Sequence, residues 1–109
     1  MEEQKNKTIV GVEVWVQYEA WSTVLEDGIP TDVREKDKGL VKKAAPLGGK
    51  PGQKEFHRHT NLRDIEFIFP DMVKASGFAD IVKTMPGMKV LRIVPKPGAG
   101  SQSGGVWRP

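Results

Sequence analysis

Apolar and polar residues alternate most clearly near the start of the chain, over residues 8–21. Every second residue from Val10 to Tyr18 is apolar, which is the period of a strand with one buried face. β-branched and aromatic residues, which strands favour, dominate this segment. Asp27-Gly28 follows and is a strong turn signal. We therefore predict a first strand in this segment, with a turn after it.

A second strand, a helix and a third strand are predicted in the second half of the chain. Residues 64–69 alternate as a strand does and end at Pro70. Asp71 can cap a helix, and an apolar stripe at helical spacing follows it, formed by Phe78, Ile81, Val82 and Met85. The largely apolar segment 90–94 predicts a strand covered on both faces. The core is expected to contain Phe67, Phe78, Ile81 and Leu91.

The middle of the chain carries weaker signals. Thr31 can begin a short helix that Gly39 would end. Residues 39–55 are rich in glycine and proline, and we interpret them as a mobile basic loop. These elements predict an α+β fold, with a small mixed sheet of about three to four strands and one principal helix packed on one face. The second and third strands are expected to run parallel. We predict a single domain spanning residues 1–97, followed by a flexible Gly/Ser-rich tail over residues 98–109.

Composition and missing motifs exclude several classes of protein. The 109 residues suit one domain and contain no cysteine, which excludes a disulfide framework and a thiolate nucleophile. No apolar run approaches the roughly 18 residues of a membrane span, and the first residues lack the order of a secretory signal. We expect a small soluble cytoplasmic protein without membrane contact. Gly49-Lys50 precedes Pro51 instead of the hydroxyl residue of a phosphate-binding loop. A dinucleotide fingerprint and the strand–elbow–helix context of a nucleophilic serine are also missing, so we expect no cofactor, catalytic residue or enzymatic activity.

One cluster of residues has metal-binding chemistry. In an extended Glu55-x-His57-x-His59 segment, all three side chains would project from one face. A single strand rarely supplies every ligand of a metal ion, and no second cluster in the sequence completes the shell. We therefore expect two surface histidines and no metal.

The distribution of charge says more than the net charge of +3. Residues 1–33 carry −5, residues 34–63 carry +6 and residues 64–109 carry +2. A basic middle segment favours a polyanionic partner, and phosphate contacts of this kind have low sequence specificity. We predict a non-enzymatic accessory protein that binds DNA or RNA through a basic loop, with the contacts made by Lys38, Lys42, Lys43, Lys50, Lys54, Arg58 and Arg63.

A second hypothesis is a protein-interaction module, such as an inhibitor, an adaptor or an assembly factor. Its apolar anchors would be Trp15 and Trp21, taken to share one face of the first strand, or Trp107 in the tail. Glu13 and Glu19 lie among the first two indoles and would repel a phosphate backbone. The strand-1 face is therefore not expected to contact nucleic acid. The sequence leaves open the choice of partner, the oligomeric state and the burial of these tryptophans.

Overall fold

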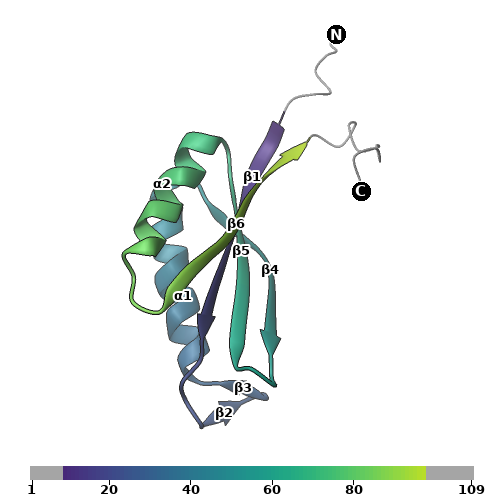
Figure 1. Ribbon diagram of the computed structural model, residues 1–109, viewed down its shortest axis with the longest axis vertical. Helices are drawn as coiled ribbons and strands as arrows, with labels where there is room; N and C mark the ends of the chain where they lie inside the picture. The colour runs from purple at the N-terminus through teal and green to yellow at the C-terminus, as the bar shows by residue number, and fades with distance from the viewer. Residues whose placement is uncertain (1–8, 98–109) are drawn as a thin grey trace.

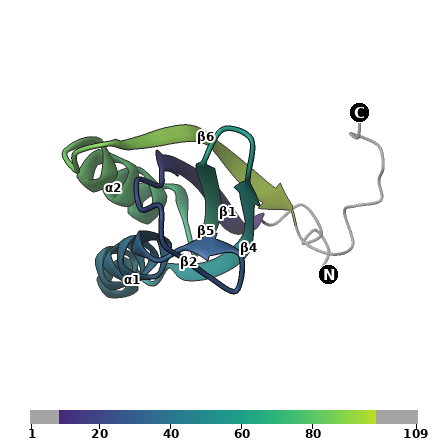
Figure 2. The same ribbon diagram turned by 90° about the horizontal axis from the view of Figure 1, so that it is seen from below.

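A four-stranded antiparallel sheet forms one layer of the fold, in the computed structural model that describes residues 9–97 (Figure 1). Its strand order is β4-β5-β1-β6, with bounds β1 (Ile9–Glu19), β4 (Lys50–His57), β5 (Leu62–Phe69) and β6 (Met88–Pro97). Helices α1 (Asp32–Ala44) and α2 (Met72–Lys83) cover one face of this sheet (Figure 2). A small hairpin of β2 (Leu25–Glu26) and β3 (Ile29–Pro30) precedes α1, and the turn η2 (Ala45–Leu47) follows it.

The main elements follow one another as β-α-β-β-α-β, an arrangement of two split β-α-β units known as ferredoxin-like. The predicted α+β class is confirmed. Strands β5 and β6 run parallel, as predicted, because both pair antiparallel with β1, which lies between them. Every neighbouring pair is thus antiparallel, so the prediction of a mixed sheet was wrong.

The period-two pattern of β1 and β5 sorts their side chains between the two faces of the sheet. Val12, Val14 and Val16 face the helices and are buried. On β5, Ile65, Phe67 and Phe69 oppose them and are also buried. The predicted strands over these segments are confirmed, and they supply most of the sheet's contribution to the core.

Helix α2 begins and packs much as the sequence predicts. The Asp71 side chain accepts a hydrogen bond from the Lys74 backbone N–H at 2.9 Å, which satisfies one of the free donors of the first turn. The Phe78 ring is fully buried. The predicted core members Ile81 and Leu91 are only half-buried. The helix presents a different stripe to the sheet, formed by Ala75, Phe78, Ala79 and Val82, and Leu91 lies at the register shift of β6 on β1.

The prediction of a mobile loop over residues 39–55 was wrong. Gly39 has no left-handed backbone angle, so α1 continues through it, and the buried Leu40 and Ala44 extend the apolar stripe of the helix. Gly48 then ends η2 with a φ of 78°, and the rest of the segment forms β4 at one edge of the sheet. The short helix predicted after Thr31 thus extends to Ala44 and lies beside α2 on the same face of the sheet.

Strand β6 forms the other edge of the sheet. It pairs with β1 across a register shift next to Leu91 and continues through Pro95, which edge strands tolerate because one side of the backbone needs no partner. None of the apolar residues over 90–94 is fully buried, and the helices cover only one face of the sheet (Figure 2), so the prediction that both faces of this strand are covered was wrong. The predicted tail of residues 98–109 lies outside the residues that the structure describes. Neither helix within residues 9–97 has the length and apolar character needed to cross a membrane.

Candidate nucleic-acid interface

Five of the seven predicted basic residues lie on two adjoining elements, α1 and β4. Lys38, Lys42 and Lys43 lie on α1, and Lys50 and Lys54 lie on β4. All five are exposed, and none has an ion-pair partner among residues 9–97. We call these five residues the lysine row.

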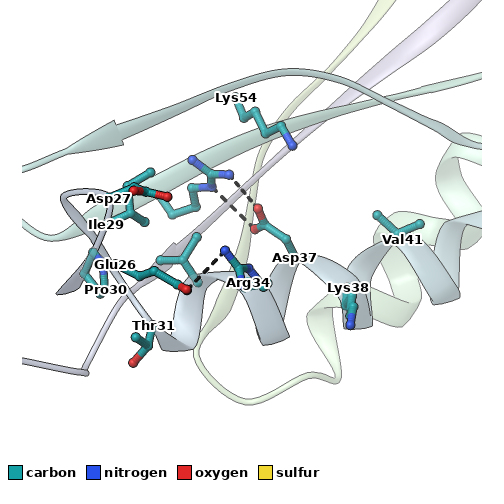
Figure 3. Close-up of a pocket in the computed structure, with 12 residues that line it drawn as sticks. Glu26, Asp27, Ile29, Pro30, Thr31, Arg34, Asp37, Lys38, Val41 and Lys54 are labelled. Carbon is teal, nitrogen blue, oxygen red and sulfur yellow. Dashed lines mark hydrogen bonds and ion pairs between the residues drawn. The ribbon is translucent and has the colours of Figure 1, made fainter. Parts of the chain in front are cut away.

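The chain path brings the lysines of α1 and β4 together. The Gly49 backbone N–H donates to the Ala44 carbonyl at 3.0 Å, so β4 begins next to the last turn of α1 and returns along it (Figure 1). Lys38 and Lys54 line one cavity of about 410 Å³ between the two elements. Figure 3 shows Lys54 pointing from β4 toward Asp37 of α1. At the far end of β4, the Arg58 side chain reaches the β2–β3 turn, where a Cβ on Gly28 would lie 2.9 Å from its Nη2 atom.

Arg34 also lines this cavity and was not among the predicted contacts. It lies four residues before Lys38 and eight before Lys42, which places the three side chains on one stripe of α1. This spacing is visible in the sequence only if the helix is extended through Gly39. The Arg34 Nη2 atom pairs with Glu26 Oε1 at 3.1 Å, on the exposed surface (Figure 3).

Arg63 is a correction to the predicted site. Its side chain is only 9% exposed and pairs with Asp37 of α1, Nη2 to Oδ2, at 2.5 Å. By the register of β5 on β1, residue 63 points toward the helices, opposite the buried Tyr18. The guanidinium therefore holds α1 against the sheet and is withdrawn from any phosphate contact.

Tyr18 completes this network from the central strand. Its hydroxyl donates to Asp37 Oδ1 at 2.6 Å and also lies 3.1 Å from the Val33 carbonyl oxygen. Burial, and secondarily the hydrogen bond and the negative charge of Asp37, raise the pKa of Tyr18 far above its ordinary value of 10. The network is thus built on a tyrosine that stays protonated in the folded protein.

The raised pKa of Tyr18 predicts a loss of stability in alkali. Above pH 10 the unfolded chain releases this proton while the folded chain keeps it, so the free energy of unfolding falls by up to about 1.4 kcal/mol per pH unit. Tyr18 is the chain's only tyrosine, so tyrosinate absorbance reports it directly. The folded protein should show no tyrosinate near pH 10, whereas the chain in denaturant should titrate there. Equal titration in both states would contradict the prediction.

The sheet face away from the helices has the opposite charge. Among residues 9–97, acids outnumber bases on this side. By the strand register it carries the acids Glu13, Glu19, Glu55, Asp64 and the buried Glu66, against the bases Lys50, Lys89 and Arg92. Trp15 lies among them, half-buried. Its Nε1 donates to Glu13 Oε1 at 3.1 Å, and the Arg92 guanidinium lies 4.8 Å from the ring centroid. The α1–β4 edge, with its exposed lysines, therefore attracts a polyanion more strongly than the sheet face away from the helices.

The other tryptophans are not brought to this face. β1 ends at Glu19, so Trp21 lies in the following loop. The prediction that Trp15 and Trp21 share one strand face was therefore wrong. Its side chain is 73% exposed, close in sequence to the exposed Val24 and Leu25. Trp107 lies outside the described residues.

The two histidines are also separated. β4 ends at His57, and His59 lies in the turn toward β5, so the extended Glu55-His57-His59 arrangement does not form. Asp64 of β5 takes the third place beside Glu55 and His57.

Comparison of the chain with protein-family models, curated proteins and solved structures finds no match.

Proposed function

We propose that this protein binds nucleic acid without catalysing a reaction, through phosphate contacts made by α1 and β4. The observation that carries the proposal is the lysine row, whose five cations are exposed without ion-pair partners among residues 9–97. The lysines of α1 span about 7.5 Å of helix and those of β4 about 13 Å of strand, so the row can contact several phosphates from two elements. Contacts to phosphate provide affinity with little discrimination between bases.

The proposal predicts a steep dependence of affinity on salt. With Arg58, the lysine row supplies six cations. Neutralising six phosphates gives log K against log salt a slope of about −5 on duplex and about −4 on single strands. Fluorescence anisotropy with labelled oligonucleotides of both kinds, over a range of salt concentrations, measures the slope. Affinity that does not change with salt would contradict the phosphate contacts.

Paired lysine variants locate the contact. Replacing Lys42 and Lys43 together by alanine should flatten the duplex slope by about two units, because two phosphates lose their partners. Replacing Lys74 and Lys83 by alanine removes the same charge from exposed positions on α2, outside the α1–β4 edge. This control should keep the wild-type slope. Equal effects of the two double variants would show that net charge alone, and not this edge, determines binding.

A second function is supported by the exposed apolar side chains of Trp21, Val24 and Leu25. Exposed aromatic and aliphatic groups of this kind are typical anchors of protein interfaces. Trp15 suits this role less, because Glu13 and Arg92 already contact its indole. Binding to a protein partner that persists at high salt, and that Trp21→Ala abolishes, would favour the interaction module over the nucleic-acid proposal.

A further inference from the structure

Three potential metal ligands converge on the sheet face away from the helices, near the turn between β4 and β5. Glu55 and Asp64 are directly opposite in the strand register, and His57 lies two residues beyond Glu55. Side chains two residues apart on a strand share a face. The pairing of the two strands thus gathers one imidazole and two carboxylates, which the sequence of β4 alone cannot do.

The distances between the ligand atoms suit a small metal ion. His57 Nε2 lies 3.0 Å from Asp64 Oδ2 and 3.7 Å from Glu55 Oε1. One ligand atom from each of the three residues lies within 4.8 Å of the other two. A tetrahedral ion with bonds of about 2.0–2.1 Å holds its ligands about 3.3 Å apart. The Glu55 side chain is 66% exposed, so solvent and not packed protein surrounds the ligand atom that lies farther from His57.

Charge also favours a cation at this position. Glu55 and Asp64 are like charges directly opposite on neighbouring strands, an arrangement that destabilises a sheet. A single proton on His57 Nε2 can form a good hydrogen bond with only one of the two carboxylates. A divalent ion in place of that proton can bind the nitrogen and both carboxylates at once.

A neighbouring strand orients one of the ligands. Gln17 of β1 lies opposite Asp64, and its Nε2 donates to Asp64 Oδ1 at 2.9 Å. That hydrogen bond occupies one carboxylate oxygen and leaves Oδ2 directed at His57. Hydrogen bonds that fix a ligand from outside the coordination shell are a regular feature of metal sites.

We propose that Glu55, His57 and Asp64 bind one divalent transition-metal ion of the zinc class, with water completing the coordination. The imidazole donor favours zinc, copper or nickel over magnesium and calcium, which prefer oxygen ligands alone. Three protein ligands on an accessible surface leave a position open. Two ligands of this site lie on β4, but they point to the face of the sheet away from α1, whereas Lys54 points toward α1 (Figure 3).

Zinc titration of the chelator-treated full chain, by isothermal calorimetry, tests the proposal. One zinc ion should bind per chain with micromolar affinity and raise the thermal midpoint by several degrees, while magnesium and calcium should not. Cobalt should give the visible absorption bands of a tetrahedral ion. No binding of zinc, or binding of calcium as tight as that of zinc, would overturn the proposal.

Variants distinguish this site from adventitious binding to a surface histidine. His57→Ala should abolish zinc binding, whereas His59→Ala, which removes the other histidine of the chain, should leave it unchanged. Gln17→Ala should weaken it by about 10–100-fold. Circular dichroism of each metal-free variant establishes that it folds. Equal losses in the two histidine variants would overturn the proposal. The nucleic-acid proposal fails separately, through the salt slope, which His57→Ala should not change.

Discussion

Replacing Phe78 by alanine should lower the free energy of unfolding by about 3–5 kcal/mol. The Phe78 ring is fully buried between α2 and the sheet, with centroids 5.1 Å from the Phe67 ring and 5.0 Å from the Phe69 ring. Its removal leaves a cavity at the contact of both aromatic residues. Small domains have about 5–15 kcal/mol of stability in total, so this single change should remove a large part of it. Urea unfolding followed by circular dichroism measures the loss.

A substitution on the same helix provides the control for Phe78. Val73 is 81% exposed in the first turn of α2, and Val73→Ala should change the free energy of unfolding by less than about 0.5 kcal/mol. A Phe78→Ala protein that melts within a few degrees of the wild type would contradict the observed packing of α2 on β5.

Replacing Asp37 by alanine should cost about 3–5 kcal/mol of folding free energy. The Asp37 and Arg63 side chains are only 14% and 9% exposed, so the guanidinium would be left without its partner in a poorly solvated site. The Tyr18 hydroxyl would also lose its hydrogen bond to Asp37 and keep only the Val33 carbonyl as an acceptor, which adds the smaller cost of one lost hydrogen bond. Denaturant unfolding of the variant measures both effects together.

Two further variants separate the buried ion pair from ordinary surface charge. Arg34→Ala breaks the exposed pair with Glu26, whose side chains are 67% and 53% exposed, and should cost less than about 1 kcal/mol. The double variant Asp37→Ala, Arg63→Met removes the isolated charge and should recover much of the stability lost in Asp37→Ala. A double variant no more stable than Asp37→Ala would show that the unpaired guanidinium is not the source of the loss.

The strongest local patterns of the sequence correspond to elements of the structure. Alternation over residues 8–21 and 64–69 predicts β1 and β5, because one face of each strand is buried and the other is not. Asp71 marks the start of α2, since the cap is a contact within four residues of chain. The turn at Asp27-Gly28 is also local, with positive φ at both residues. Each of these features depends on residues that are neighbours in the sequence.

Helix α1 and strand β4 were misread because their stability comes from other parts of the chain. Gly39 weakens the helix intrinsically by about 1 kcal/mol relative to alanine. Burial of Leu40 and Ala44 against the sheet offsets this cost. β4 has no apolar alternation, and its place in the sheet follows from backbone pairing with β5. Glycine and proline content therefore predicted a loop where tertiary contacts form a helix and an edge strand.

The two candidate sites also differ in how far local sequence, as opposed to tertiary contacts, determines them. Clustering of lysine along residues 38–54 is visible in the sequence, and charge remains on the surface whether the segment is loop, helix or strand. The buried state of Arg63 depends on Asp37, 26 residues away, and the carboxylate of Asp64 reaches Glu55 and His57 only through the register of β4 on β5. Local sequence determined where the charges and the strand periods lie. Strand pairing and helix docking, which join residues far apart in the chain, decided which charges are exposed, which are neutralised and which converge.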